Sequence, residues 1–364
     1  MNAGSGDERR AVRVGLVGVR AHGRTIFDAA RRCGALEVVA LCDHDAQAAA
    51  EAGERFGLDV CGFEELLDDE RIEALLIVTP NHVHEEQCIA ALDAGRHVFV
   101  EKPLALDARA SARIARRAQE TGLVVQVGHN ARFADAVAVV QSLIEEGVLG
   151  TLVSVDAQFS HDAALFHPVA PWKLDAAQCP LLPMTQLGIH LVDTLRVLCG
   201  EITAVQCIAA ERMLRGADGR TVHDVTCALV RFAGGVVGSI HASYIVPDLL
   251  AFRICGHRGH VHGTPEHVDL VARTGETRRT QQYPVEGGFA ASFRDELRAF
   301  ADAVRGRAPV AVDAIEGLIN VAVVDAMQRA AATRCEVRVG DVLADLGVLL
   351  PRDARIDALL TSGG

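Results

Sequence analysis

The first third of the chain alternates short apolar strand patterns with helix patterns, and this alternation constrains the fold more than any other feature. Val12–Val17 and Leu36–Cys42 are typical of buried strands, and a helical pattern at Thr25–Cys33 separates them. The alternation continues through strand patterns at 72–78, 97–100 and 123–127. Strands that alternate with helices of this length imply right-handed crossovers and a parallel sheet. We therefore expect an α/β fold that begins with a doubly wound, Rossmann-type dinucleotide-binding domain over residues 1–130.

The pattern changes near Gly128. Leu152–Phe159 alternates as a half-buried strand does, and the segments that follow at 203–212, 222–232 and 236–246 are rich in β-formers. Glycine-containing turns join these segments, which favours antiparallel hairpins. Helical patterns at 292–304 and 313–332 come last. We expect a substrate-binding α+β domain over residues 131–345 with a largely antiparallel open sheet, followed by a C-terminal tail at 346–364.

Composition and charge exclude several classes of protein. The 364 residues carry a formal net charge of −12 and only 12 Phe, 2 Tyr and 1 Trp, which argues against nucleic acid and anionic membranes as partners. The 10 cysteines form no C-x-x-C pair and are typical of reduced, buried thiols. The polar N-terminus lacks the apolar core of a signal peptide, and no apolar run is long enough for a membrane span. We expect a soluble cytoplasmic protein.

The first strand leads into the turn V17-G18-V19-R20-A21-H22-G23-R24. A pyrophosphate binds at this place in dinucleotide-binding folds, on backbone amides and the positive end of a helix. Gly18 and Gly23 match G-x-G-x-x-G, but Arg20 stands at the middle glycine, where its guanidinium could contact the phosphates instead. Asp43 ends the second strand, where an acid accepts hydrogen bonds from the adenosine ribose. The alternative for Asp43 is a helix cap, a role that Asp45 is available to fill.

The strand at 97–100 runs into Glu101-Lys102-Pro103. Proline has no amide proton to donate, so strand pairing must stop there, and the residue before it is biased toward an extended backbone. The Lys102 ammonium then either reaches bulk water at a turn or faces a cleft. The residues alone leave both interpretations open.

Together these motifs resemble the Gfo/Idh/MocA family of NAD(P)-dependent oxidoreductases, from about residue 12 to residue 339. The motifs that carry the resemblance are the glycine turn, Asp43, T79-P80-N81-H82-V83-H84, E101-K102-P103, G128-H129-N130-A131-R132, W172-K173 and Q186-L187-G188-I189-H190-L191-V192-D193. The chain departs from the family at Gln186, since many members have Asp four residues before the histidine.

The resemblance implies a role for each matching residue. Lys102 would stabilise developing alkoxide charge on the substrate beside the nicotinamide, and His190 would transfer the proton, although a lone histidine is more often a core imidazole. Gln186, one helical turn before His190, would bond to its ring. Residues expected to bind the cofactor are Gly18, Arg20, Ala21, His22, Gly23, Asp43, Thr79, Asn81, His84, Glu101, Lys102 and Asn130. Residues expected to bind substrate are Arg132, Trp172, Lys173 and Asp193; for Trp172 the alternative is a core position.

A cluster of Cys255, His257, His260, His262 and His267 is compatible with zinc by residue type. Odd spacing along a strand sends side chains to opposite faces, however, so only His260 and His262 share one. We expect no metal site.

The expected function is transfer of a hydride from a secondary hydroxyl of a sugar, cyclitol or sugar derivative to NAD. NAD is favoured over NADP because Asp43 would repel a 2′-phosphate. Two alternatives stay open: a non-catalytic sugar sensor that binds dinucleotide, and an enzyme whose tightly bound NAD drives epimerisation or elimination. The resemblance also implies a homodimer or homotetramer.

Overall fold

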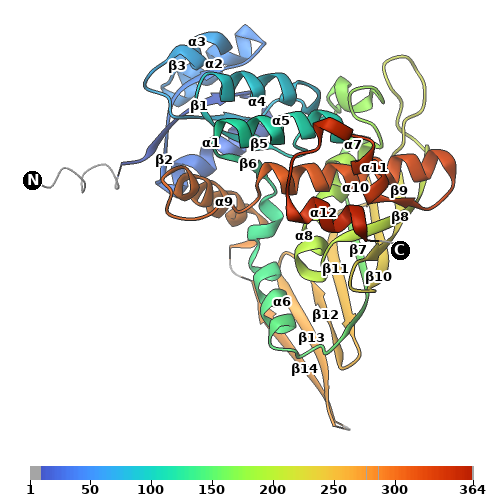
Figure 1. Ribbon diagram of the computed structural model, residues 1–364. Helices are drawn as coiled ribbons and strands as arrows, with labels where there is room; N and C mark the ends of the chain where they lie inside the picture. Colours follow the sequence, from blue (N-terminus) through green and yellow to red (C-terminus); the bar gives the residue numbers. More distant parts are fainter. Residues whose placement is uncertain (1–9, 276, 286, 363–364) are drawn as a thin grey trace, which may run out of the picture. The chain divides into compact units, whose positions relative to one another are not determined.

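The computed structural model describes residues 10–275, 277–285 and 287–362, and these form two compact units (Figure 1). The first unit holds residues 10–130 and Phe293–Leu318; the second holds the described residues of Ala131–Ser292 and of 319–362. The ends of the predicted first domain and tail, 1–9 and 363–364, lie outside the described residues. The first unit therefore includes a late segment that we had placed in the second domain.

In the first unit, the described residues form a parallel six-stranded sheet in the order β3-β2-β1-β4-β5-β6. This is the doubly wound order that the alternating pattern predicted, with its reversal between β1 and β4. The central strands are apolar on both faces because helices cover both. The strands are β1 Val12–Val17, β2 Leu36–Cys42, β3 Asp59–Val60, β4 Ala74–Ile77, β5 His97–Glu101 and β6 Val125–Gly128; the helices are α1 Ala21–Cys33, α2 Ala46–Phe56, α3 Phe63–Asp68, α4 His84–Asp93 and α5 Ala108–Thr121.

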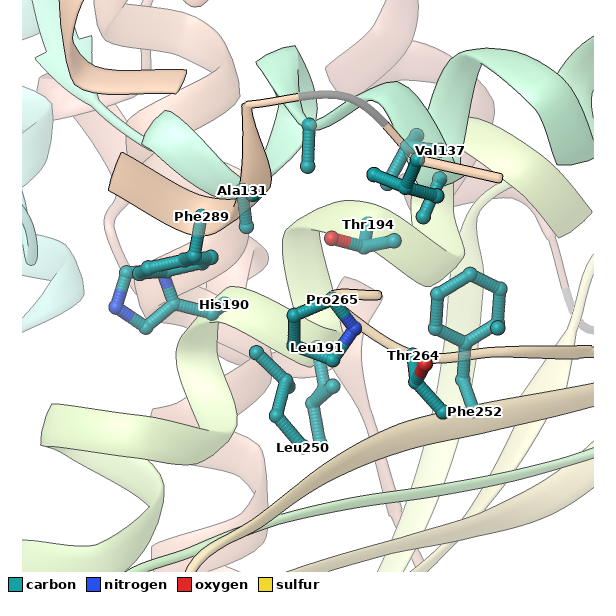
Figure 2. A pocket seen from close by; sticks show the side chains of 15 residues that line it. Ala131, Val137, His190, Leu191, Thr194, Leu250, Phe252, Thr264, Pro265 and Phe289 are labelled. Carbon is teal, nitrogen blue, oxygen red and sulfur yellow. The ribbon is translucent and has the colours of Figure 1, made fainter. Parts of the chain in front are cut away.

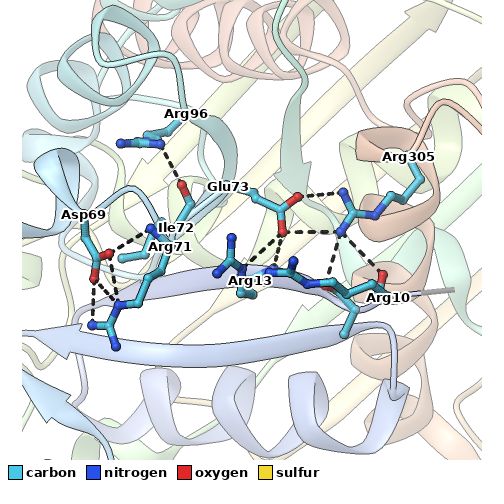
Figure 3. A network of polar contacts seen from close by, with 9 residues as sticks. Arg10, Arg13, Asp69, Arg71, Ile72, Glu73, Arg96 and Arg305 are labelled. Atoms are coloured by element: carbon cyan, nitrogen blue, oxygen red, sulfur yellow. Dashed lines mark hydrogen bonds and ion pairs between the residues drawn. The ribbon is translucent and has the colours of Figure 1, made fainter. Parts of the chain in front are cut away.

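Helix α9, Gly288–Val304, brings the late segment back to this sheet. The ring of Phe300 meets that of Phe99 edge-on with centroids 5.8 Å apart. Just after α9, Arg305 binds the carboxylate of Glu73 at 2.7 Å and donates to the carbonyl of Ala11 at 3.2 Å (Figure 3). The helical pattern at 292–304 is visible in the sequence, but its partners lie more than two hundred residues away and carry no local signal.

In the second unit, the described residues form a nine-stranded sheet in the order β14-β13-β12-β11-β7-β10-β9-β8-β15. Neighbouring strands are antiparallel except β7 and β10, which are parallel. This confirms the largely antiparallel open sheet. The strands are β7 Leu152–Ser160, β8 Ile202–Ala210, β9 Val225–Phe232, β10 Val237–Ser243, β11 Leu249–Gly256, β12 Gly259–Gly263, β13 His267–Thr274, β14 Thr277–Pro284 and β15 Val337–Arg338.

One face of this sheet is covered and the other is open. A π-helical turn, Met184–Gly188, continues into α8 Ile189–Cys199, and both pack on β7, with the turn also on β10. Ile208 and Leu229 on the opposite face are 74% and 55% exposed. The remaining long helices of this unit are α6 Asp135–Glu145 and α10 Ala314–Thr333, which begins in the first unit.

The predicted tail is a folded element within its described part. Helix α12, Ala354–Thr361, packs on α11, Val339–Ala344, and buries Ile356 and Leu359. Asp353 accepts the amide of Arg355 and so caps α12 at its N-terminus. Across the described residues, no helix combines the length and apolar character that crossing a membrane requires.

Candidate functional site

The glycine turn of the first unit lies tightly between β1 and α1. Gly18 has a φ of +93°, and a Cβ there would lie 2.5 Å from the carbonyl oxygen of Val78. A Cβ on Gly23 would lie 2.1 Å from the carbonyl oxygen of Gly18. Any side chain at either position would push the turn open. Arg20, which precedes α1, gives the helix no side-chain cap, so the first amides of α1 suit an anion.

Asp43 stabilises the glycine turn through a hydrogen bond. Its Oδ2 accepts the amide of Val19 at 3.0 Å, and its Oδ1 accepts the amide of Asp45 at 3.0 Å. The Asp43 side chain is only 4% exposed. A carboxylate oxygen has two lone pairs, so these bonds leave acceptor capacity for a ribose hydroxyl. The ribose contact of Asp43 stays a prediction, and sequence reasoning did not indicate its bond to the turn.

Asp45 caps α2 by accepting the amides of Gln47 and Ala48, as the sequence predicted. It also forms an ion pair with Arg20, whose side chain is 62% exposed. Hydrogen bonds from the capped amides lower the pKa of Asp45, and Arg20 adds to this effect. The guanidinium of Arg20, which we expected on the phosphates, is thus engaged by a neighbouring carboxylate.

Glu101 and Lys102 lie where β5 ends. Glu101 is 5% exposed; its Oε1 lies 2.9 Å from Nε2 of His22 and its Oε2 accepts the amide of Lys102 at 3.2 Å. Burial opposes ionisation of Glu101, but His22 and Lys102 outweigh it and lower its pKa. The peptide bond between Lys102 and Pro103 is cis. The carboxyl end of β5 therefore presents a buried carboxylate directly before a half-buried lysine.

His84, in the first turn of α4, joins two loops. Its Nδ1 lies 2.9 Å from the carbonyl oxygen of Pro103 and its Nε2 lies 2.9 Å from that of Thr79. The ring is 1% exposed, and burial lowers its pKa although both carbonyls favour the protonated form. We expected His84 to contact the cofactor, but its two nitrogens face backbone carbonyls. It positions the loops that carry Thr79 and Lys102.

Two other predicted cofactor residues lie at the ends of neighbouring strands. Asn81 begins a short 3-10 turn after β4 and is 2% exposed. Asn130 follows β6 and is 1% exposed. Because both side chains are buried, their amide groups are fixed in place and are not solvated. Their contact with a cofactor stays a prediction.

His190 lies in the first turn of α8 and is 7% exposed. Its ring centroid is 5.7 Å from that of Phe159 and 6.2 Å from that of Phe289. Gln186 lies in the π-helical turn, and its Nε2 donates to Sγ of Cys179 at 3.5 Å. The α-helical spacing assumed for Gln186 and His190 is therefore modified by a wider turn, of a kind frequent at functional sites.

Arg132 and Asp193 bind each other, and their contact with a substrate stays a prediction. Arg132 donates to both carboxylate oxygens at 3.0 and 2.5 Å, and Asn320 donates to Oδ1 at 2.8 Å. Asp193 is 0% exposed. A fully buried carboxylate with these donors is a structural anchor. Its partner Asn320 lies 127 residues away in the sequence, so no motif could have indicated it.

Trp172 and Lys173 lie on a short turn, Pro171–Leu174. Lys173 Nζ lies 5.6 Å from the indole centroid, a cation–π arrangement, and both residues are half-buried. Trp172 is therefore not among the fully buried residues. Contact with a substrate stays a prediction.

The covered face of the second sheet holds two polar residues that sequence reasoning missed. His161 follows β7 and Tyr244 follows β10, and their rings meet edge-on with centroids 4.5 Å apart. Burial raises the pKa of Tyr244 and lowers that of His161. Both continue the inward alternation of their strands, on the same side as Phe159. Tyr244 lies within the strand pattern at 236–246 and His161 two residues beyond that at 152–159, so following the inward alternation along both patterns would have indicated them.

Next to His190 the second unit encloses an apolar pocket (Figure 2). Segments from α6, α8, β11 and the β12–β13 turn line it. No group of three or more potential metal ligands gathers among the described residues.

A doubly wound sheet with a glycine turn and an acid after β2 defines a dinucleotide-binding protein. The chain belongs to the Gfo/Idh/MocA oxidoreductases. Residues 12–129 match the part of this family described as an NAD-binding Rossmann fold, and residues 141–339 match its C-terminal alpha/beta domain. The protein is thus an NAD(P)-dependent oxidoreductase.

Curated relatives resemble the chain at moderate identity. Levoglucosan dehydrogenase of Pseudarthrobacter phenanthrenivorans is 31% identical over 56% of this chain and 58% of its own length. The scyllo-inositol 2-dehydrogenase (NAD(+)) of Bacillus subtilis is 31% identical over 71% of this chain and 75% of its own. The 1,5-anhydro-D-fructose reductase of Ensifer adhaerens is 28% identical over 88% and 96%.

Solved structures share the fold. Levoglucosan dehydrogenase in complex with NADH and levoglucosan has a TM-score of 0.84 at 24% identity, covering 91% of this chain and 100% of its own. A putative NADPH-dependent oxidoreductase from Desulfitobacterium hafniense also has a TM-score of 0.84, at 22% identity, over 92% and 99%.

Proposed function

We propose that this protein is a dehydrogenase that transfers a hydride from a secondary hydroxyl of a sugar, cyclitol or sugar derivative to NAD. One observation carries the proposal: the buried Glu101 carboxylate and Lys102 follow each other at the carboxyl end of β5, and Glu101 contacts His22 of the glycine-turn helix. Ligands of open α/β sheets bind at this edge. The relatives named for levoglucosan, scyllo-inositol and anhydrofructose support the substrate class.

The residues of the first unit fit a dinucleotide. The glycines at 18 and 23 leave room for a pyrophosphate against the amides that open α1, and Asp43 has acceptor capacity for a ribose. Asn81, Glu101 and Asn130 would hold the nicotinamide half. When bound, NAD supplies the hydride acceptor.

The chain's own groups would handle the proton and the charge. Oxidation of a C–OH group releases a hydride from carbon and a proton from oxygen. His190 would accept that proton, since imidazole titrates near neutrality. The Lys102 ammonium would donate a hydrogen bond to the same oxygen and stabilise its developing negative charge.

We propose NAD rather than NADP as the cofactor. Asp43 would face a 2′-phosphate, and two unit charges ~4 Å apart at an effective dielectric of ~20 repel by ~4 kcal/mol. Arg20 or Arg24 could offset part of this repulsion, although Arg20 is paired with Asp45 in the structure. The relatives include enzymes named for each cofactor, so measurement must decide. Equal kcat/KM with NAD and NADP would contradict the proposal.

The test of the function is NADH formation against a panel of inositols, aldoses, anhydrosugars and uronic acids. Lys102→Met should lower turnover about 10²-fold or more, the usual cost of losing an oxyanion donor, while NAD still binds. A variant that keeps more than about a tenth of the wild-type rate would remove Lys102 from the mechanism. Dinucleotide binding without turnover of any alcohol would favour a non-catalytic sugar sensor. Product that forms without accumulation of NADH would favour an enzyme whose tightly bound NAD is reduced and reoxidised in each catalytic cycle.

We also propose that copies of the chain associate through the open face of the second sheet. Ile208 and Leu229 are joined there by Val237, which is 46% exposed. Exposed apolar patches on a sheet are frequently protein interfaces. Sedimentation of Leu229→Arg should show a smaller species than the wild type; identical sedimentation would contradict this interface.

A further inference from the structure

The first turn of α1 and the end of β5 meet in a pair formed by an imidazole and a carboxylate. Nε2 of His22 lies 2.9 Å from Oε1 of Glu101, and the His22 side chain is 45% exposed whereas Glu101 is buried. The space around the carboxylate is tight, because a Cβ on Gly128 would lie only 3.1 Å from the same Oε1. A buried charge is thus in contact with an imidazole that water can reach.

The charge of this pair changes with pH, since imidazole is the side chain that ordinarily titrates near neutrality. Burial opposes ionisation of Glu101, but His22 and Lys102 outweigh it and lower the pKa of Glu101, so the carboxyl group stays ionised. With His22 neutral, the pair carries one negative charge. With His22 protonated, the two charges of the pair cancel.

The other groups around the pair keep their charge over the range in which an imidazole titrates. Lys102 acts on Glu101 as a cation, and a lysine ordinarily titrates at about pH 10. Burial lowers the pKa of His84, which favours its neutral ring, and both ring nitrogens face backbone carbonyls. From α9, the uncharged ring of Phe293 meets the imidazole of His22 edge-on, with centroids 5.6 Å apart. A change in the charge of the pair therefore comes from His22.

The oxidised and reduced cofactors differ by one positive charge, which the nicotinamide ring of NAD carries and that of NADH lacks. A negative pair at the end of β5 attracts this charge and so favours the oxidised form, whereas a pair without net charge does not. A protonated imidazole in the first turn of α1 also attracts the diphosphate. Because the diphosphate is the same in both forms, this attraction cancels in the ratio of the two affinities.

We propose that His22 is a positioning residue whose protonation sets the relative affinity of the protein for NADH and NAD. With His22 neutral, the charge of Glu101 favours NAD. With His22 protonated, that advantage is lost and NADH binds relatively more tightly. The inference rests on the proposed function, which puts the nicotinamide half of the cofactor beside Glu101. In a mixture of both forms, acid conditions would increase the fraction of the protein that holds NADH.

The first experiment measures the dissociation constants of NAD and NADH by calorimetric titration, without any alcohol and at constant ionic strength, between about pH 5 and pH 8. The ratio of Kd for NADH to Kd for NAD should fall about tenfold from the alkaline to the acid end. This is the effect of one unit charge at ~12 Å with an effective dielectric of ~20. A ratio that does not change with pH in the wild type would overturn the inference.

Two variants fix the charge at this position. His22→Gln keeps a hydrogen-bond donor but is always neutral, so the ratio should stay at the alkaline value of the wild type at every pH. His22→Lys is always positive, so the ratio should stay at the acid value. Both substitutions fall on an exposed side chain, which favours normal folding. A ratio that still changes with pH in His22→Gln would assign the effect to another group and overturn the inference.

His44 provides the matched control. Its Nδ1 lies 2.9 Å from Oδ1 of Asp43 and its side chain is 81% exposed, so it is a second imidazole paired with an acid in the same unit. Asp43 is expected at the adenosine ribose, however, and the adenosine half is identical in NAD and NADH. His44→Gln should therefore keep the pH dependence of the wild-type ratio. Loss of that dependence in His44→Gln would show that the ratio does not report on Glu101, and would overturn the inference.

These measurements keep the cofactor preference and the reaction distinguishable, because they need no substrate. If no alcohol reduces NAD but the ratio follows the predicted pattern, the proposed dehydrogenase fails and the role of His22 stands. If sugars are oxidised but the ratio is independent of pH, the role of His22 fails and the dehydrogenase stands. The 2′-phosphate is common to NADP and NADPH, so the same ratio can be measured with that pair. Binding of none of these cofactors would contradict both proposals.

Discussion

In the first unit the candidate groups follow strands of one sheet, whereas in the second they come from distant segments. Asp43, Thr79 and Glu101 each end or follow a strand of one parallel sheet. Asp193 depends on Arg132 and on Asn320, which is 127 residues away. Local motifs thus position the first group of residues, and tertiary packing positions the second.

The comparison predicts that single changes in the second unit cost the most stability. Asp193→Ala leaves the Arg132 guanidinium without its buried carboxylate, and breaking a buried pair from one side costs about 3–5 kcal/mol. Urea unfolding followed by fluorescence of Trp172, which lies in the same unit, would measure this. Asp341→Ala, an exposed acid on α11, is the control and should cost much less. Equal losses would mean that the Asp193 anchor is dispensable.

Much of the first unit could be predicted from sequence, because its signals are local. Apolar runs, glycine spacing and the acid after Leu36–Cys42 are all encoded within a few residues, and the structure confirms the strands that they predicted. Even there, the two backbone contacts of His84 could not be predicted. Its motif indicated a functional histidine, but only the fold shows that its nitrogens face carbonyls from two different loops.

In the second unit sequence reasoning indicated His190 as a candidate but not the contacts that its neighbours make. Asp193 looked like a substrate contact because it follows His190 by three residues, yet its carboxylate is turned to Arg132. A π-helical turn is not distinguishable from an α-helical one by apolar periodicity over five residues. The pocket walls come from strands and helices whose meeting only the fold decides.

A second prediction tests the first unit at His84. His84→Phe removes the donor between two loops and leaves a buried carbonyl unpaired, which costs about 1–3 kcal/mol. Because the same loops carry Thr79 and Lys102, NAD affinity should fall together with stability. His84→Gln, which keeps an amide donor, should recover part of both. If His84→Phe lowered stability but left NAD affinity unchanged, His84 would be a core residue with no effect on the site.

A third prediction concerns the electrostatics at His190. Gln186→Asp places a carboxylate near the ring, which favours the protonated imidazole and raises the apparent pKa of the base. The acidic limb of the kcat/KM profile should therefore move to higher pH, by up to about one unit or ~1.4 kcal/mol. Gln186→Asn has the same shorter side chain as Gln186→Asp but is neutral, so it distinguishes the effect of charge from that of side-chain length. It should leave the acidic limb of the kcat/KM profile in place. A limb that does not move in Gln186→Asp would mean that the two side chains do not interact.

The smallest effect is expected at the ion pair that ties the end of α9 to the first sheet. Burial opposes ionisation of Glu73, but its bonds to Arg305 and to the amide of Arg13 outweigh this and lower its pKa. A carboxyl whose folded pKa is below its unfolded value stabilises the protein above the unfolded pKa, near 4.3, and loses that contribution as pH falls through the folded pKa. Glu73 is 29% exposed, so screening limits the pair to about 1 kcal/mol or less.

Glu73→Gln should therefore be less stable than the wild type at pH 7 and nearly equal to it at pH 3, in urea unfolding at matched ionic strength. Asp345→Asn removes the exposed pair with Arg329 and serves as the control, because solvent screens that pair more completely. A Glu73→Gln deficit that is the same at both pH values would assign the effect to lost packing rather than to charge. In that case α9 would be fixed in the first unit by apolar contacts such as that of Phe300 with Phe99. The difference between the interactions that stabilise each unit internally would then be smaller than their polar groups suggest.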